Sequence, residues 1–215
     1  MNPLESKHPV LIVGGGGHAK VVAELLQRLN RHVLGYIDSA ETSLSDMGIQ
    51  YLGDDQVGLK LDKQAISVTI GVGFLPGSML RHRLYKAYKK AGFHFESFIH
   101  PSSTVAADVI VADGSQVMAG SIIQTGSVIG VNVVVNTGAI IDHDCIVDEG
   151  CHIAPGACLC GAVKLARNVF VGSKATIIQE IDVAADTTIG AGAVITHNIE
   201  KASIIKPAQV VITER

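Results

Sequence analysis

The sequence predicts a small Rossmann-like α/β domain with a parallel sheet, followed by a parallel β-helix. Two patterns carry this prediction. In the second half, every sixth residue is aliphatic without interruption from Val105 to Ile195. In the first half, the apolar run Val10 to Val13 leads into a glycine-rich turn and an amphipathic stretch. Aromatic residues make up only 4% of the chain and tryptophan is absent, which suits thin aliphatic layers.

Composition narrows the class of protein. The chain has 215 residues, of which 47% are hydrophobic and 17% charged, so it can bury a core and is too apolar for general disorder. A net charge of −3 without a basic stripe argues against a nucleic-acid partner. The apolar runs are too short for membrane insertion, and residues 1–9 lack the apolar segment of a secretory signal. We therefore expect a cytoplasmic location.

The cysteines are crowded into one short stretch of the solenoid. Their spacing contains no Cys-x-x-Cys pair, so a zinc site has little support. We interpret them as reduced thiols that fill core space, and we expect no metal. They are Cys145, Cys151, Cys158 and Cys160.

The first domain is expected over residues 9–100, after a polar tail at 1–8. Apolar runs and amphipathic stretches alternate along it, which indicates strands that are joined by helices and pair in parallel. The expected strands cover 10–13, 33–37, 66–70 and 93–99, and the expected helices cover 19–29 and 80–91.

The solenoid is expected over residues 101–200. Four residues after each large aliphatic residue stands a mostly small one, such as Ala139 or Cys151. One large and one small residue in six suits short strands and tight corners, and such strands bury their inner face only when coils stack. Gly130, Gly172 and Gly190 follow directly after an aliphatic position, where we expect a corner with positive φ.

The regular repeat is expected to end near Ile199. Lys201 and Pro207 fall where the next two aliphatic residues are due. The remaining residues, 201–215, are expected to form a tail with one short strand at 206–212.

The glycine turn is a candidate phosphate site. Gly14, Gly16 and Ala19 fit the spacing G-x-G-x-x-A, and Asp38 follows at the end of the second strand. Backbone N–H groups at a helix N-terminus favour a phosphate, and the acid can accept from a ribose or a base. The domain is too short for two mononucleotide halves, which favours a nucleoside diphosphate over NAD. The alternatives are a purely structural turn and an NAD enzyme that uses the solenoid to oligomerise.

His143 is the candidate catalytic base. It lies in Asp142-His-Asp-Cys145, two residues past the inward Ile141, which places it at or just beyond a corner where a side chain can leave the core. Either flanking acid can contact the imidazole and raise its basicity. The alternative is a solvated surface histidine.

His152 follows nine residues later, which is half a triangular coil. The two histidines of one chain therefore belong to different flanks of the prism. If both serve one site, neighbouring subunits supply them, and a homotrimer with sites between subunits is the natural closure. The alternative for His152 is a packing or surface role.

These features together resemble one group of hexapeptide-repeat acetyltransferases. The glycine turn with His-Ala-Lys20, the small α/β domain and the solenoid with Asp-His-Asp-Cys145 are similar to bacillosamine-pathway amino-sugar N-acetyltransferases and sialic acid O-acetyltransferases. The resemblance implies a left-handed β-helix, an exception to the usual crossover rule. It also implies acetyl-CoA as co-substrate and a UDP-linked 4-amino-4,6-dideoxy sugar as acceptor, for glycan biosynthesis.

The resemblance assigns roles residue by residue. His143 is the implied general base, and Asp144 is the acid that raises its basicity. The implied contacts to the UDP-sugar are Gly16, Gly17, His18, Asp38, Ser39 and Gly71. The implied contacts to acetyl-CoA are His152, Ser173 and Ala191. We expect direct transfer in a ternary complex, with His152 or a backbone N–H stabilising the oxyanion.

One segment departs from the family pattern. Relatives often have Gly-Asn or Gly-Asp after the strand that ends at Gly71 and then an arginine shortly after, whereas here an apolar loop over residues 72–80 precedes Arg81. Two further alternatives stay open: a sugar O-acetyltransferase on the same fold, and a non-catalytic nucleotide-binding or scaffold protein. The acids beside His143 argue against the scaffold.

Overall fold

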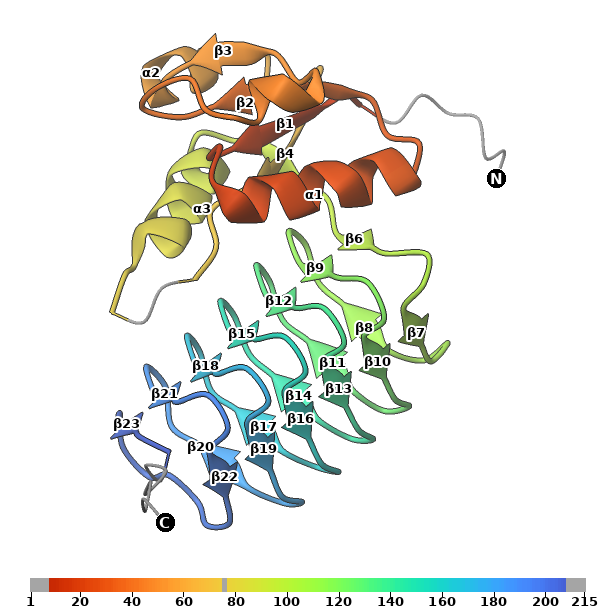
Figure 1. Cartoon of the computed structure of the whole chain (residues 1–215), viewed down its shortest axis with the longest axis vertical. Coiled ribbons are helices and arrows are strands. Elements are labelled where there is room, and N and C mark those ends of the chain that lie inside the picture. Colours follow the sequence, from red (N-terminus) through yellow and green to blue (C-terminus); the bar gives the residue numbers. More distant parts are fainter. Residues whose placement is uncertain (1–7, 75–76, 208–215) are drawn as a thin grey trace, which may run out of the picture. The chain divides into compact units, whose positions relative to one another are not determined.

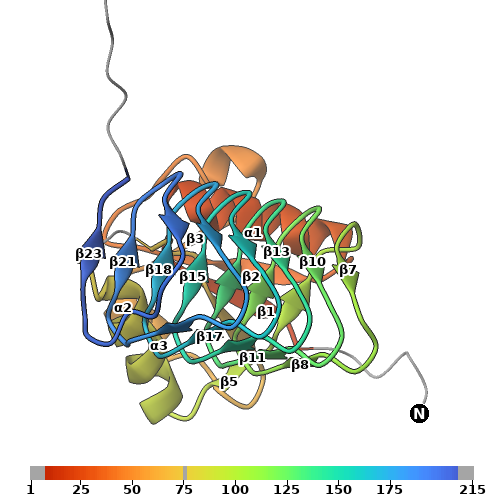
Figure 2. The same cartoon turned by 90° about the horizontal axis from the view of Figure 1, so that it is seen from below.

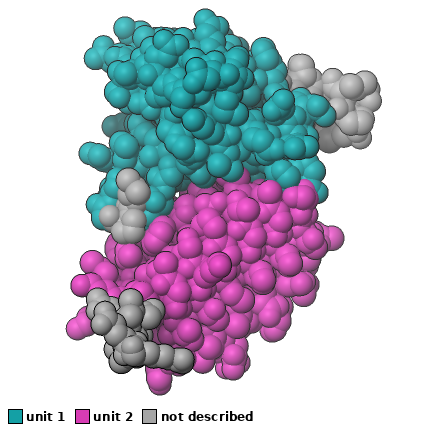
Figure 3. Space-filling model, in the orientation of Figure 1, with its two compact units in different colours: residues 1–101 teal, residues 102–215 magenta. Residues whose placement is uncertain are grey.

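The computed structural model describes residues 8–74 and 77–207 of the chain. The chain divides into two compact units, Met1–Pro101 and Ser102–Arg215 (Figure 3).

The first unit is built on a parallel sheet, in which the strands stand in the order β3-β2-β1-β4-β5 (Figure 1). The strands β1 and β4 are buried along their whole length, as expected for a parallel sheet with covered faces. Their neighbouring carboxyl ends form the point where the strand order reverses, and ligands of such sheets bind there. The bounds are β1 (Val10–Val13), β2 (Val33–Ile37), β3 (Tyr51–Gly53), β4 (Ser67–Ile70) and β5 (His94–Phe95).

Helices flank this sheet. The first helix buries Val22, Leu25 and Leu26 on one face, which confirms the amphipathic pattern. It begins two residues before the predicted start, because the glycine turn runs directly into helical backbone. The bounds are α1 (Gly17–Arg28), η1 (Ser45–Met47), α2 (Asp55–Gly58) and α3 (Leu80–Lys90).

Three short elements of this unit were not predicted: η1, β3 and α2. Each is too short to show a hydrophobic period, although Asp54 caps α2 by accepting from the N–H groups of Gln56 and Val57. The predicted strand at 93–99 is divided into β5 and β6 (Phe98–Ile99). Between them Glu96 binds Arg31, whose Nη2 donates to Oε1 at 2.8 Å.

Within its described residues, the second unit winds into parallel sheets built of two-residue strands. Successive coils nest behind one another, and each strand pairs with the one a full coil away (Figure 2). The first face comprises β7 (Thr104–Val105), β10 (Ile122–Ile123), β13 (Ile140–Ile141), β16 (Cys158–Leu159), β19 (Thr176–Ile177) and β22 (Val194–Ile195). The second face comprises β8 (Ile110–Val111), β11 (Val128–Ile129), β14 (Ile146–Val147), β17 (Lys164–Leu165) and β20 (Asp182–Val183). The third face comprises β9 (Gln116–Val117), β12 (Val134–Val135), β15 (His152–Ile153), β18 (Phe170–Val171), β21 (Thr188–Ile189) and β23 (Ile204–Ile205).

Corners separate these faces. We call the turns after the first-face strands the first corner; they include residues 143–144 and 161–162. The turns after the third-face strands are the third corner, and they include residues 173–174 and 191–192. This arrangement is the left-handed β-helix that the repeat and the resemblance predicted.

The solenoid core is made of the two predicted columns. The second residue of each strand points inward, as Ile141 and Ile153 do, and both are fully buried. Small residues such as Ala157 fill the space between them and belong to the same hydrophobic cluster. Because every coil contributes one layer, the core is continuous along the solenoid.

The expectation of positive φ at Gly130, Gly172 and Gly190 is wrong. The left-handed residue of each corner stands two positions later, at Asn132, Lys174 and Gly192. The three glycines instead admit the backbone of the next coil. A Cβ on Gly172, for example, would lie 2.5 Å from the backbone nitrogen of Ala191.

The solenoid continues past the expected end at Ile199. Ile199 forms a bridge with Val183, and Ile205 pairs with Ile189. In both pairs the two paired residues are two positions closer in sequence than in the regular coils. The last coil is therefore two residues shorter. The shift explains why Lys201 and Pro207 stood at aliphatic positions. Of the strand predicted at 206–212, residues 206 and 207 are not in a strand, and the rest lies outside the described residues.

Helices in the described part of the chain do not combine the length and the apolar character needed to cross a membrane.

Candidate active site

The four glycines at the start of α1, Gly14 to Gly17, divide into two pairs. A Cβ on Gly14 would lie 2.5 Å from Val72 Cγ2, and one on Gly15 would lie 2.6 Å from Thr42 Oγ1. Nothing lies within 4 Å of the corresponding positions on Gly16 and Gly17, which are both exposed. The first pair therefore lets the turn pack, and the second pair leaves the N-terminus of α1 open.

The open end of α1 suits an anion. Gly16 provides no side-chain cap, and the first turn contains no acidic residue. It contains His18 and Lys20 instead, although the positive end of the helix dipole favours negative charge. The backbone N–H groups of the helix N-terminus, the helix dipole and a nearby lysine together favour a phosphate at this point.

Asp38 braces the glycine turn. Its Oδ2 accepts from the N–H of Gly15 at 2.7 Å, and its Oδ1 accepts from the N–H of Ser39 at 2.6 Å. Thr42 adds a second brace, since its hydroxyl donates to the carbonyl of Gly15 at 2.8 Å. The carboxylate thus holds the turn that was expected to meet the nucleotide, and exposed Ser39 stands beside it.

Gly71 and Arg81 join the end of β4 to the same turn. Gly71 is buried, and a Cβ there would meet the carbonyl oxygen of Gly14. The buried guanidinium of Arg81 donates to the carbonyls of Ile70 and Val72 at 3.0 and 2.9 Å. Burial lowers the pKa of Arg81 to about 9, which still leaves it cationic at neutral pH. Arg81, which follows the apolar loop in sequence, therefore caps the carboxyl end of β4.

His143 and Asp144 form a pair on the first corner. Nδ1 of the imidazole lies 2.8 Å from Oδ2 of Asp144, and the two side chains are 55% and 67% exposed. With Nδ1–H donating to the carboxylate, Nε2 keeps the lone pair that a base needs. The hydrogen bond to Asp144, with the charges of Asp142 and Asp144, raises the pKa of His143 above 6.5.

The two flanking acids have different tasks. Asp142 accepts from the backbone N–H of His143 at 2.8 Å through Oδ1. Asp142 thus closes the corner, and Asp144 alone of the two hydrogen-bonds the ring.

Replacing Asp144 by asparagine tests this division. A general base acts in its neutral form, so the rate rises with pH through the elevated pKa of His143. We expect Asp144→Asn to lower that pKa and to move the acidic limb of the kcat profile to lower pH. The maximal rate should also fall, because the imidazole loses its orientation. Rates measured across pH 5–9 in wild type, Asp144→Asn and Asp142→Asn give the comparison. An equal or larger displacement in Asp142→Asn would contradict the assignment.

The residues predicted to meet acetyl-CoA lie on another part of the solenoid. His152 is buried on the third face and stacks on Phe170, with ring centres 5.4 Å apart. Ser173 and Ala191 are exposed at the third corner on successive coils, where Gly192 N–H donates to Ser173 O at 2.9 Å. The third face lies opposite the first corner of a triangular coil. One chain therefore does not bring His152 and His143 together, as their spacing predicted.

Cys145 and Cys151 are buried and behave as packing thiols, whereas Cys158 and Cys160 are half-buried. Cys145 donates to the carbonyl of Cys160 and Cys151 to that of Ala166, at 3.2 and 3.1 Å. Burial raises the pKa of these two thiols to about 11 and about 12, so both stay protonated at neutral pH. Neither is suited to carry an acyl group.

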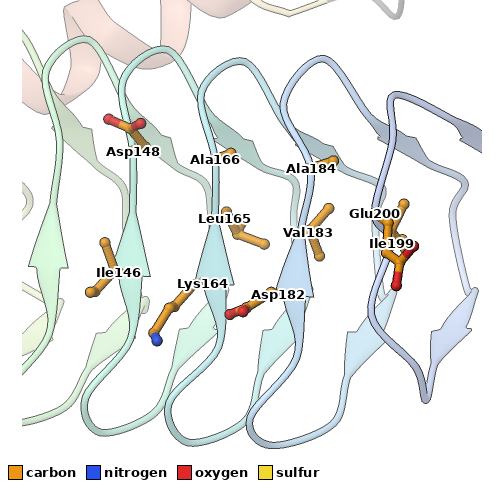
Figure 4. A pocket seen from close by; sticks show the side chains of 10 residues that line it. All are labelled: Ile146, Asp148, Lys164, Leu165, Ala166, Asp182, Val183, Ala184, Ile199 and Glu200. Carbon is orange, nitrogen blue, oxygen red and sulfur yellow. The ribbon is translucent and has the colours of Figure 1, made fainter.

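A shallow hollow of about 440 Å³ lies on the second face (Figure 4). Exposed Lys164 and Asp182 on neighbouring strands line it, and neither His143 nor Asp144 does. Within residues 8–74 and 77–207, His, Cys, Asp and Glu side chains do not gather in a group of three that suits a metal ion.

Comparisons with known proteins agree with this architecture. Residues 9–88 match the family model of the PglD N-terminal domain. A mutant of perosamine N-acetyltransferase from Caulobacter crescentus, solved with CoA and GDP-perosamine, is 34% identical with a TM-score of 0.82, over 91% of this chain and 90% of that one. The acetyltransferase domain of PglB from Neisseria gonorrhoeae FA1090, solved with acetyl coenzyme A, is 32% identical with a TM-score of 0.86, over 95% and 100%. The comparison with curated sequences gives no match.

A glycine-turn sheet followed by a left-handed β-helix is the architecture of a hexapeptide-repeat acetyltransferase. The sequence identity to these sugar N-acetyltransferases, over nearly the whole of each chain, shows which group of hexapeptide-repeat enzymes this chain belongs to. The chain belongs to the family of hexapeptide-repeat sugar N-acetyltransferases, which confirms the resemblance seen in the sequence.

Proposed function

We propose that this enzyme transfers the acetyl group of acetyl-CoA to the 4-amino group of a UDP-linked 4-amino-4,6-dideoxy sugar, with His143 as the general base. The observation that carries this proposal is the His143–Asp144 pair, 2.8 Å apart on an exposed corner. A solvated histidine would not need an acid that holds one ring nitrogen and leaves the other free.

The proposed reaction is a direct transfer. The amine nitrogen attacks the carbonyl carbon of the thioester, a C–N bond forms, and the C–S bond breaks. Nε2 of His143 takes the proton that the nitrogen loses, and the departing sulfur ends as the thiol of CoA after protonation. The imidazolium that forms in this step is stabilised by the carboxylate of Asp144.

In the proposed site, the glycine turn binds the diphosphate of the nucleotide sugar that accepts the acetyl group. The exposed backbone at Gly16 and Gly17, with His18 and Lys20 beside it, suits a diphosphate. We infer that Ser39, whose N–H donates to the braced Asp38, contacts the nucleoside. A GDP-linked amino sugar is the second candidate, because the perosamine enzyme at 34% identity was solved with GDP-perosamine.

In the proposed site, a neighbouring copy of the chain helps to bind acetyl-CoA. We infer a homotrimer in which one subunit presents His143 and the next presents His152, Ser173 and Ala191 to acetyl-CoA. The position of His152 on the face opposite His143, the exposure of Ser173 and Ala191 at another corner, and the exposure of the His143 pair support this arrangement. The described cysteines are free thiols, which fits the reducing cytoplasm where we place the reaction.

A panel of acceptors tests the substrate. Release of free CoA is followed with UDP-4-amino-4,6-dideoxy sugar, GDP-perosamine, UDP-GlcNAc and free sialic acid. We expect the highest kcat/KM with the UDP-amino sugar and competitive inhibition by UDP. A preference for GDP-perosamine, with inhibition by GDP, would replace the nucleotide in the proposal. Turnover with sialic acid alone would replace N-acetylation by O-acetylation.

A further inference from the structure

Gly161 is the residue that the next coil places directly beneath the His143 ring. A Cβ built on Gly161 would lie 2.5 Å from Nε2 and 2.6 Å from Cε1 of the imidazole. Nε2 is the ring nitrogen that does not contact Asp144, and Cε1 joins it to Nδ1. Contacts this short do not occur for real side chains, so the ring and a side chain at this position exclude one another.

The backbone at Gly161 does not require glycine. Its φ lies outside the left-handed region, whereas the following residue, Ala162, has a φ of 58°. Alanine in that conformation is strained, and glycine would relieve it. The corner therefore carries its glycine one residue before the position where backbone freedom is needed.

The same position in other coils takes ordinary side chains. Along the described solenoid the first residue of the corner is, for example, Thr125, Pro155, Arg167 or Gln179, and Gly161 is the one glycine among them. A local rule broken in this way indicates a functional requirement. The residue that benefits is His143, because no other group stands over the missing side chain at that distance.

The preceding coil also places a glycine against the other half of the pair, although at Gly126 a φ of 73° already favours glycine. A Cβ on Gly126 would meet Oδ1 of Asp144, so the carboxylate also lies against a glycine. Asp108 accepts from the N–H of Gly126 and from the hydroxyl of Thr125, both at 2.8 Å, which anchors that corner. The pair thus occupies a slot whose two walls are Gly126 and Gly161.

We propose that Gly161 is a positioning residue of the acetyl transfer, and that its missing side chain holds the His143 ring against Asp144. The proposal rests on the proposed function, since it assigns His143 as the base. A methyl group at position 161 displaces Nε2 and Cε1, which turns Nδ1 away from the carboxylate and moves the basic nitrogen from its place. The geometry of proton transfer is sensitive to such displacements.

The variant Gly161→Ala tests this, with Gln179→Ala as the control that places alanine at the same corner one coil later. We expect kcat to fall about 10-fold or more in Gly161→Ala, with the KM for acetyl-CoA little changed. Its Tm should match or exceed that of wild type, because alanine suits this backbone better than glycine. The pKa of His143, followed by NMR titration of its ring protons, should fall toward the ordinary value. Gln179→Ala should leave all four quantities unchanged.

A normal kcat together with an unchanged His143 pKa would overturn the proposal. If Gly161→Ala folds poorly, the stability cost is measured with and without His143→Ala; a cost that persists without the imidazole also overturns it. The NMR titration and the stability comparison use no substrate. An inactive wild-type enzyme would therefore refute the proposed function and leave the inference about Gly161 open to these two measurements.

Discussion

Replacing His143 by asparagine should lower kcat by about 10²–10⁴-fold. Asparagine keeps much of the size of the side chain and has no lone pair basic enough to take a proton from the attacking amine. The side chain is 55% exposed at the first corner, so its loss should leave Tm and the KM for both substrates close to wild type. Steady-state rates and thermal melts measured on the same preparation provide the test.

His197 supplies a matched control for that experiment. It stands further along the first corner, at the position equivalent to His143, and its Nδ1 contacts the hydroxyl of Thr196 at 2.9 Å. Having no acid on its ring in the described structure, it should not act as a base. His197→Asn should keep normal turnover. Equal losses in the two variants would point to a shared structural role and would contradict the assignment of His143.

Filling the open end of α1 should weaken binding of the nucleotide sugar. Gly16 has an extended backbone, with φ −76° and ψ −167°, and a Cβ there meets nothing within 4 Å. Gly16→Val is therefore tolerated by the fold but occupies the approach to the helix N–H groups. We expect the KM for the nucleotide sugar to rise about 10–100-fold, since charge-assisted hydrogen bonds to the diphosphate are lost. The KM for acetyl-CoA and the free energy of unfolding should stay near wild type.

The neighbouring glycine separates binding from folding in this test. A Cβ on Gly15 would lie 2.6 Å from Thr42 Oγ1 and 2.8 Å from Tyr36 Cε2. Gly15→Ala should therefore lower the free energy of unfolding, by about 1–3 kcal/mol. If Gly16→Val is destabilised to the same extent while its KM is unchanged, the open end of α1 is not the acceptor site.

The sequence predicted most of the fold because its periods are strong. An unbroken six-residue period excludes a helix and leaves a solenoid, and the offset of His143 from Ile141 already placed it at a corner. The shortened last coil could not be predicted, since Lys201 and Pro207 interrupt the period and only pairing shows that Ile205 resumes it. The elements β3 and α2 were missed because their few residues show no period.

The candidate site was predictable where its residues are adjacent in sequence. His143 has an acid on each side; the resemblance assigned Asp144, and the structure shows Asp144 on the ring and Asp142 on the backbone. Asp38 was expected to meet the nucleotide, and its tight bond to Gly15 became visible only in three dimensions. Gly161 was missed because its partner His143 is a full coil away, and only the structure shows that the left-handed residue of this corner is Ala162 and not the glycine.

The most direct test of the central claim is product analysis after incubation of this chain with acetyl-CoA and a UDP-4-amino-4,6-dideoxy sugar. NMR of the purified product identifies the acetylated atom, and the yield of free CoA gives the stoichiometry. We predict one acetyl group on the 4-nitrogen for each CoA released, and background release when His143→Asn replaces the wild type. An acetyl ester on a hydroxyl, or equal turnover by the two proteins, would contradict the account.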